Sequence, residues 1–238
     1  MADFLNNAVF GWYPYLTLTV FIVGSIVRFD REQYTWRSGS SQLLRRRELM
    51  WGSNLFHIGI LVIFVGHFVG LLTPIWIFHE LGLSNTFKQL MAIVVGGVAG
   101  LFCLVGIALL THRRLFDVRI RRNSSFGDIA ILLLLFVQLL LGLATIPVSL
   151  DHLDGGEMVR FMTWAQGILT LQPGVAELVS DASPVFKLHL FLGMTIFLVF
   201  PFTRLVHVWS APVWYLGRRG YQVVRSNRPA VLQKEAGR

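Results

Sequence analysis

The sequence predicts an all-α integral membrane protein, built as a five-transmembrane-helix bundle. Hydrophobic residues make up 54% of the 238 positions, charged residues make up only 14%, and the mean hydropathy is +0.61. An average soluble domain carries roughly 25% charged residues. Five apolar runs are long enough for a helix to cross the hydrocarbon core, which takes roughly 20 residues. These observations exclude an ordinary soluble domain.

The expected helices lie near residues 8–27, 50–72, 89–110, 128–148 and 185–209. Residues 1–209 then form one transmembrane domain, and the polar, basic residues 210–238 form a cytoplasmic tail. The amino-terminal segment MADFLNNAVFGW lacks a basic start and a small-residue cleavage site, so we expect it to be retained in the first helix. After the fourth helix, MVRFMTWAQGILTLQ is short and interrupted by polar residues, which favours a helix lying in the membrane interface.

Positive charge is concentrated in alternate loops of this predicted bundle. Of the 21 Lys and Arg residues, 17 lie in the loops after the first and third helices and in the carboxyl-terminal tail. Cytoplasmic loops of membrane proteins carry the excess of Lys and Arg. The amino terminus is therefore expected outside and the carboxyl terminus in the cytoplasm. The same distribution indicates membrane topology and not nucleic-acid binding.

Four histidines lie inside two of the apolar runs: His57 and His67 in the second, and His189 and His207 in the fifth. An imidazole in hydrocarbon needs a partner, because an unsatisfied polar group there is costly. The second helix runs from inside to outside and the fifth runs back. Depth therefore pairs His57 with His207 near the cytoplasm and His67 with His189 near the outer face.

Two imidazoles per site are typical axial ligands of one haem iron, whereas they leave the usual tetrahedron of zinc incomplete. The pattern thus predicts two haems stacked across the membrane. The spacings do not match, however, since ten residues of helix span about 15 Å and eighteen span about 27 Å. A kink at Pro201 can absorb part of this difference.

The remaining histidines and the single cysteine indicate no further centre. His79, His112 and His152 lie at helix ends or in loops, where water can satisfy them. Cys103 lies in an apolar stretch, so the chain has neither a disulfide framework nor a cysteine cluster. Any iron–sulfur chemistry must belong to another subunit.

Several segments resemble the gamma subunit (cytochrome b) of bacterial respiratory nitrate reductases. They are REQYTWRSGSSQ at 31–42, SNLFHIGILVIFVGHFVGLLTPIW at 53–76, DHLDGGEM at 151–158 and KLHLFLGMTIFLVFPFTRLVHVWSAPVWYL at 187–216. The resemblance covers almost the whole chain. It implies a five-helix subunit of the bacterial cytoplasmic (inner) membrane that oxidises quinol, either menaquinol or ubiquinol. It also implies two b haems, together with partner iron–sulfur and molybdenum subunits on the cytoplasmic face.

The resemblance also assigns residues. His57 and His207 match the ligands of the inner haem, and His67 and His189 match those of the outer haem. Lys88, at the outer start of the third helix, matches a lysine associated with the quinol site, although an interfacial lysine reaching to water is the alternative. Gly66 would leave room for the quinol ring, or it serves helix packing with Gly70.

Arg204 lies one helical turn before His207 and would share its side of a helix. A haem propionate needs a cation, and arginine binds carboxylates in a bidentate manner. A lipid headgroup anchor is the alternative role. Arg113 and Arg114 are weaker candidates for the propionate.

Two other functions compete with this interpretation. A haem-free anchor or a small transporter belongs to a different class, but a transporter favours inverted repeats or broken midplane helices, and the sequence indicates neither. The second alternative is the cytochrome b subunit of another quinone-linked enzyme, of the formate dehydrogenase or hydrogenase type. The soluble subunits that co-purify would discriminate between these enzymes.

Overall fold

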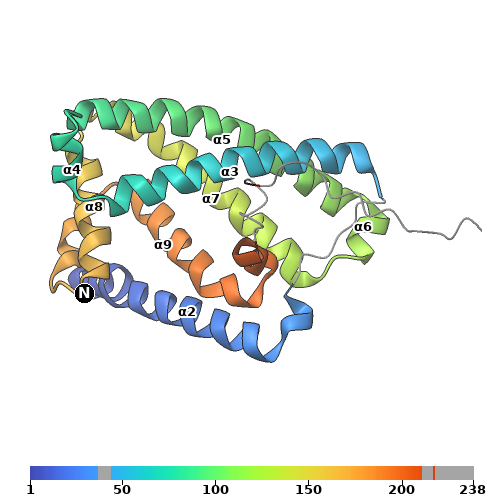
Figure 1. The fold of residues 1–238 in the computed structure, drawn as a ribbon. Coiled ribbons are helices and arrows are strands. Elements are labelled where there is room, and N and C mark those ends of the chain that lie inside the picture. Colours follow the sequence, from blue (N-terminus) through green and yellow to red (C-terminus); the bar gives the residue numbers. More distant parts are fainter. Residues whose placement is uncertain (37–43, 211–216, 218–238) are drawn as a thin grey trace, which may run out of the picture. The chain divides into compact units, whose positions relative to one another are not determined.

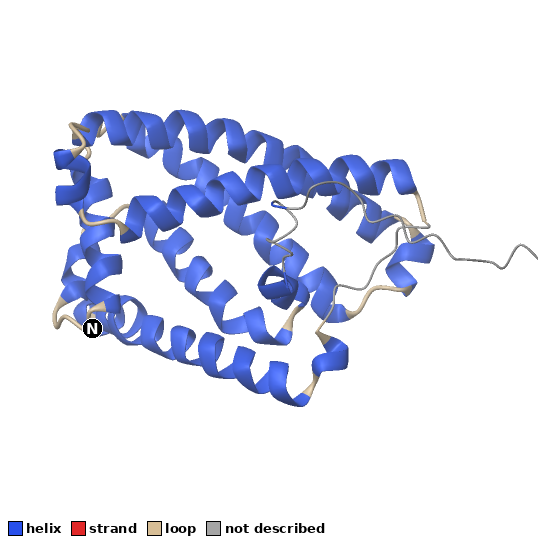
Figure 2. Ribbon diagram, viewed as in Figure 1, coloured by secondary structure: helices blue, strands red, loops and turns tan. Residues whose placement is uncertain are grey.

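The computed structural model describes residues 1–36, 44–210 and 217, and every regular element in these ranges is a helix (Figure 2). Five helical segments are long and apolar enough to cross a membrane: Asp3–Arg31, Arg46–Leu72, Asn85–Phe116, Phe126–Leu150 and Pro184–Phe202. The predicted all-α class and its five helices are therefore confirmed. The first and third segments are longer than predicted, because polar and aromatic residues at their ends continue the helix beyond the apolar run.

The α-helices are α1 (Ala2–Asn7), α2 (Tyr13–Arg31), α3 (Arg46–Leu72), α4 (Ile75–Glu80), α5 (Asn85–Phe116), α6 (Val118–Arg122), α7 (Phe126–Leu150), α8 (Gly156–Leu169) and α9 (Pro184–Val199). A π-helical turn, η1 (Ala8–Trp12), joins α1 to α2. The 3₁₀ segments are η2 (Gln33–Thr35), η3 (Val175–Val179), η4 (Phe200–Phe202) and η5 (Arg204–Ser210). Met1–His207 packs as one unit and Val208–Arg238 is a second. The predicted tail, 210–238, lies outside the described residues except for Ser210 and Gly217.

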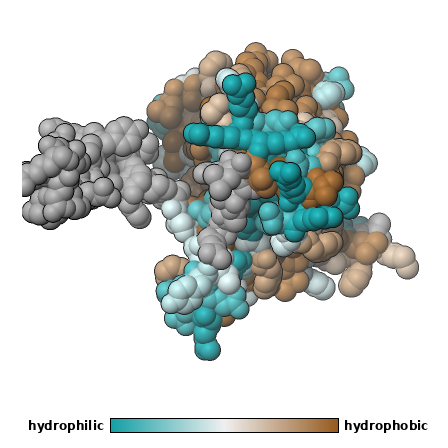
Figure 3. Space-filling model, turned by 90° about the vertical axis from the view of Figure 1, so that its right-hand side faces the viewer, coloured by the Kyte–Doolittle hydropathy of each residue, from teal (hydrophilic) through white to brown (hydrophobic). Residues whose placement is uncertain are grey.

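The long helices of the first unit pack in an open row (Figure 1). In this row α3 packs on α5, α5 on α7, α7 on α9, and α9 on α2. Among the described residues, α3 forms no comparable packing with α9 or α2. Polar side chains gather on the end of the unit that carries α6 (Figure 3). This is the end where the sequence concentrates the basic residues of the third inter-helix loop.

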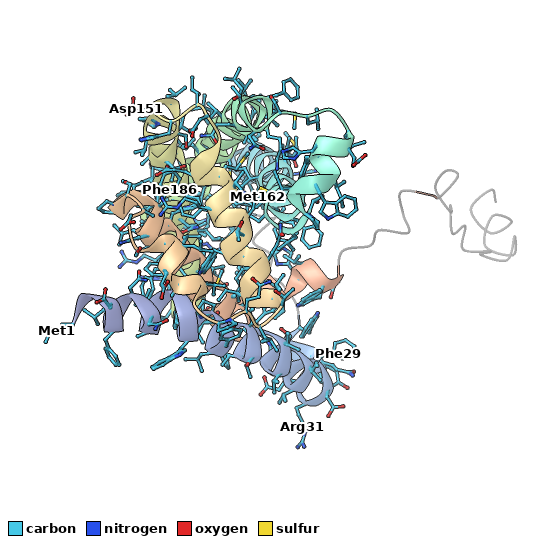
Figure 4. The ribbon with its side chains drawn as sticks, turned by 90° about the vertical axis from the view of Figure 1, so that its left-hand side faces the viewer. Met1, Phe29, Arg31, Asp151, Met162 and Phe186 are labelled. Atoms are coloured by element: carbon cyan, nitrogen blue, oxygen red, sulfur yellow. The ribbon has the colours of Figure 1, made fainter. Side chains whose placement is uncertain are left out.

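At the opposite end, α8 lies across the ends of the long helices (Figure 4). It begins and ends close to the interfacial segment predicted from sequence. The indole Nε1 of Trp164 donates to the carbonyl of Phe10 at 2.9 Å, and Gln166 Nε2 donates to the carbonyls of Leu71 and Thr73 at 3.0 and 3.2 Å. These bonds satisfy buried polar groups and fix α8 over the ends of α3 and the first helix.

Glycines bring α3 and α5 into close contact. Gly52 and Gly59 lie two turns apart on one face of α3 and are both buried. A Cβ on Gly59 would lie 2.5 Å from the carbonyl oxygen of Ala99 and 2.6 Å from the amide nitrogen of Cys103. A Cβ on Gly106 would collide with the backbone of Phe56. One face of α3 is thus committed to α5, and the face carrying the histidines is left free of it.

The fifth predicted helix, 185–209, is not continuous, and this corrects the sequence prediction. The α-helix ends at Val199, and 3₁₀ turns follow. Pro201 causes the break, because proline lacks a backbone N–H and its ring clashes with the preceding turn. Arg28 stabilises the corner by donating from Nη1 to the carbonyls of Pro201 and Thr203, at 2.5 and 2.9 Å. The chain turns there, so the axial separation of about 27 Å expected for an unbroken helix does not apply.

Candidate metal centres and their surroundings

The four membrane histidines form two pairs in the structure. His67 of α3 and His189 of α9 have ring centroids 6.1 Å apart, with planes inclined by 50°. His57 of α3 and His207 of η5 have ring centroids 6.3 Å apart, with planes inclined by 71°. These are the pairs that the depth argument predicted. The corner at Pro201 accounts for the mismatched spacings that straight helices could not reconcile.

The distance between the paired rings suits one metal ion held by two imidazoles. An imidazole nitrogen binds a metal such as zinc at about 2.0–2.1 Å, and the ring centre lies roughly 1.1 Å further on, so opposite ligands have centroids about 6.2–6.4 Å apart. Edge-to-face ring contacts cover the same range, with centroids about 4.5–7 Å apart, so the separation is consistent with a shared metal ion but does not by itself require one. Both observed separations agree with this arithmetic to about 0.1 Å.

Hydrogen bonds orient three of the four imidazoles. Nδ1 lies 2.7 Å from the Ser53 carbonyl in His57, 2.9 Å from the Ile63 carbonyl in His67, and 2.5 Å from the Arg204 carbonyl in His207. A carbonyl only accepts, so Nδ1 carries the proton and Nε2 keeps its lone pair. A metal-binding histidine commonly has this tautomer, and the carbonyl holds its ring in place.

His189 is held differently, by α7. Its Nδ1 is buried and has no hydrogen-bond partner among the described residues. The ring lies against Gly142, where a Cβ would stand 3.0 Å from Cε1, and Gln138 Nε2 donates to the His189 carbonyl at 3.1 Å. Gly142 and Gln138 lie one turn apart on α7. Sequence reasoning missed both, because only the packing of α7 on α9 brings them to the histidine.

The surroundings leave room for a planar group between the paired rings. α3, which carries His57 and His67, is not packed on α9, which carries His189, and both histidines of α3 are exposed. A Cβ added at Gly66 or Gly70 would meet nothing within 4 Å. In the described part of the chain, no group of three or more His, Cys, Asp or Glu could hold a metal. Each pair would therefore supply two imidazoles to a metal centre, and a macrocycle such as haem would supply the remaining ligands.

Lys88 of α5 is buried, with only 4% of its surface exposed. Its Nζ lies 3.2 Å from the sulfur of Met162 on α8 and 3.5 Å from the ring centre of Phe78 on α4. Figure 4 labels Met162 on the crossing helix. A lysine that reached out to water would be exposed, so that alternative is wrong. An ammonium group offers three donors, and a thioether sulfur is only a weak acceptor.

Charged groups hold together the end of the unit that carries α6. Arg204 lies in a 3₁₀ segment and not in the helix expected there, and its Nη1 is 3.7 Å from Oδ1 of Asp128. Arg114 lies 3.6 Å from Oδ2 of the same carboxylate. Arg113 is 2% exposed and donates to the Leu44 carbonyl at 2.7 Å. The propionate role expected for Arg204 stays a prediction.

The loop between α5 and α7 presents a second carboxylate at this end. Asp117 caps α6 by accepting from the backbone N–H groups of Arg119 and Ile120. These two hydrogen bonds lower the pKa of the Asp117 carboxyl below its ordinary value, and the bond from Ile120 has the larger effect. The carboxylate also lies 2.8 Å from Nε of Arg45, which precedes α3. Asp117 therefore links the loops that begin α3 and end α5.

The fold and these sites together define an integral membrane protein with five candidate membrane-spanning helices and two histidine pairs, one pair toward each end of α3. The sequence model of the nitrate reductase gamma subunit family matches residues 6–227. The chain is 51% identical over 224 residues to the respiratory nitrate reductase 1 gamma chain of Escherichia coli strain K12, covering 94% of this chain and 99% of that one. The chain belongs to the nitrate reductase gamma subunit family, which confirms the resemblance noted in its sequence.

Two further relatives agree with this assignment over nearly their whole length. The respiratory nitrate reductase 2 gamma chain of Escherichia coli strain K12 is 52% identical over 228 residues, covering 96% of this chain and 100% of that one. The nitrate reductase gamma chain of Bacillus subtilis strain 168 is 40% identical over 220 residues, covering 92% and 98%.

Proposed function

We propose that the chain is the membrane cytochrome b subunit of a respiratory nitrate reductase, which oxidises quinol near the outer face and passes electrons inward. One observation carries this proposal: two pairs of imidazoles lie at two depths, with ring centroids 6.1 and 6.3 Å apart. Membership in the gamma subunit family supports it. The nitrate chemistry itself belongs to a partner subunit.

The proposal includes an orientation and a set of partners. The amino terminus lies outside and the carboxyl terminus in the cytoplasm, because the basic loops gather at one end of the bundle. The transmembrane domain is 1–209 and the tail is 210–238. Iron–sulfur and molybdenum subunits bind at the cytoplasmic end, and the membrane is the bacterial inner membrane.

The chain's residues hold and orient two b haems. Nε2 of His57 and His207 would bind the inner iron, and Nε2 of His67 and His189 would bind the outer iron. Each haem, when bound, supplies a one-electron carrier. The backbone carbonyls that bond Nδ1 of three histidines fix the ring orientations and raise the basicity of the ligands.

The buried Lys88 is proposed to donate a hydrogen bond to a quinol oxygen, with Gly66 leaving space beside the outer pair. Lys88 Nζ has a sulfur and an aromatic face as its described neighbours, which leaves donors for a ligand oxygen. Entry of the quinol requires the Met162 or Phe78 side chain to give way. Protons released outward while electrons move inward separate charge, which is worth about 2.3 kcal/mol per charge per 100 mV.

The inner pair provides the test of this relay. We expect His57→Ala and His207→Ala to abolish quinol-driven nitrate reduction in the holoenzyme. An artificial donor that reduces the cytoplasmic subunits directly should still support activity, because it bypasses the membrane route. His112→Ala is the matched control, since the ring of His112 packs against Phe116 at the end of α5, with centroids 5.1 Å apart, and belongs to neither pair. Wild-type quinol activity in the His57→Ala enzyme would contradict the proposal.

A further inference from the structure

One carboxylate at the start of α7 joins three parts of the inner end. Asp128 closes a capping box, with its backbone N–H donating to Ser125 Oγ at 3.1 Å and its Oδ2 accepting from the Ser125 N–H at 3.2 Å. The same carboxylate forms ion pairs with Arg114 at the end of α5 and with Arg204 in η5, at 3.6 and 3.7 Å. Asp128 therefore contacts its own helix, the preceding helix and the segment after the Pro201 corner.

Arg204 connects this carboxylate to a histidine of the inner pair. The backbone carbonyl of Arg204 accepts from Nδ1 of His207 at 2.5 Å, and its guanidinium is held toward Asp128. His207 is the one paired histidine outside the long helices, in a 3₁₀ segment that follows a break. A short segment of this kind has little rigidity of its own, so side-chain anchors determine where it lies.

The three charged side chains that meet at Asp128 are largely shielded from solvent. The side chains of Arg114, Asp128 and Arg204 are 13%, 23% and 25% exposed. Charges that are largely out of water interact more strongly than those at a protein surface. Removing the carboxylate would leave Arg114 and Arg204 with less compensation, and Arg204 is bonded through its carbonyl to His207 of the inner pair. Positive charge near a redox centre favours its reduced form, since reduction adds an electron.

We propose that Asp128 is a positioning residue for the inner haem: it anchors Arg204, whose carbonyl orients His207, and it offsets the charge of Arg114 and Arg204 near that centre. The proposal rests on the haem ligation proposed above. It assigns to α7 a role at the inner pair that matches the role of Gly142 and Gln138 at the outer pair.

The test is a redox titration of both haems in the purified holoenzyme carrying Asp128→Asn. Asparagine keeps the size of the side chain, and its amide oxygen can still accept from the Ser125 N–H in the capping box. We expect the midpoint potential of the inner haem to rise and its EPR g-values to change, with the outer haem unaltered. A tenfold shift toward the reduced form, which is about 59 mV for a one-electron couple, is the order expected.

Matched variants separate this role from helix capping. Ser125→Ala removes the cap and keeps every charge, and Asp128→Glu keeps the charge, so neither should reproduce the selective shift. Arg204→Gln should move the inner potential in the opposite direction, because it removes a cation. An inner potential that is unchanged in Asp128→Asn overturns the proposal. If Asp128→Asn fails to assemble, Arg114→Gln replaces it, because it removes the other cation that Asp128 offsets; an unchanged inner potential in Arg114→Gln then overturns the proposal.

The experiment distinguishes a failure of the role proposed for Asp128 from a failure of the proposed haem ligation. A wild-type chain without two b haems refutes the ligation itself, before any variant is compared. A wild-type chain with two haems, combined with equal shifts at both haems in Asp128→Asn, refutes only the selective role of Asp128.

Discussion

At the scale of single residues, tautomer control is the property that makes the histidines suitable ligands. In His57, His67 and His207, Nδ1 is bonded to a backbone carbonyl of the preceding turn. His189 differs, because α7 presses Gly142 against its ring. The two proposed haems therefore have unlike surroundings, which gives the chain a means of setting their potentials separately.

Lys88 gives the sharpest prediction at this scale. We expect Lys88→Ala to assemble both haems but to bind quinol-site inhibitors more weakly, because a charged donor is lost. Such a hydrogen bond is worth about 1.5–3 kcal/mol, which is roughly 10- to 150-fold in affinity. The measurement is an inhibitor titration of quinol-driven turnover.

Lys187 supplies the control for this experiment. It stands near the start of α9 and donates to the Ser180 carbonyl at 2.5 Å, away from the Met162 and Phe78 contacts of Lys88. Lys187→Ala should leave inhibitor affinity unchanged. Wild-type affinity in Lys88→Ala would falsify the assignment of a quinol site to this lysine.

At the scale of helices, the fold depends on how α3 is attached. Its glycine face is fixed to α5, while its histidines face the side that α9 approaches without packing. The corner at Pro201 returns His207 to the depth of His57. Arg28 holds that corner through the carbonyls of Pro201 and Thr203. As a result, both histidine pairs bridge α3 and the α9–η5 segment, although α3 and α9 are not packed on each other.

The glycine contact between α3 and α5 predicts a stability effect. In Gly59→Ala, the new Cβ would lie 2.5 Å from the Ala99 carbonyl oxygen, so the backbones must separate. Overpacking of this kind costs about 1–3 kcal/mol. We expect a lower midpoint of thermal unfolding in detergent and a parallel fall in both haem signals, because α3 carries a proposed ligand of each haem.

Gly96→Ala is the matched control for this prediction. Gly96 lies on α5, and a Cβ there meets nothing within 4 Å. This variant should melt at or slightly above the wild-type temperature, since alanine favours a helix more than glycine does. Equal melting of the Gly59→Ala and Gly96→Ala proteins would show that the close contact does not hold the two helices together.

Sequence reasoning reached the features that depend on composition and depth. Five apolar runs predicted five helices, and the alternation of basic loops paired the four histidines correctly in space. It did not find the end of α9 at Val199, since a proline can kink a helix as well as end it. It missed Asp128 and Gly142, because nothing in the spacing along α7 shows which side chains of α5, α9 and η5 will meet them.

At the scale of the whole chain, the unit Met1–His207 holds two histidine pairs at two levels along α3. His67 pairs α3 with His189 of α9, and His57 pairs α3 with His207 of η5, the 3₁₀ segment that follows α9. His57 lies toward the start of α3, at the end where the basic residues gather, and His67 lies toward its other end, where Gln166 of α8 bonds the carbonyls of Leu71 and Thr73. Electrons would thus travel along a single file from the proposed quinol site to the cytoplasmic partners.

The most direct measurement of this claim is a set of redox-resolved optical and EPR spectra of the holoenzyme and its four single histidine-to-alanine variants. The wild type should contain two b haems per chain. His57→Ala and His207→Ala should remove the same haem signal, and His67→Ala and His189→Ala should remove the other. Loss of one common signal from the His57→Ala and His67→Ala enzymes, or a wild type without haem b, would contradict the account.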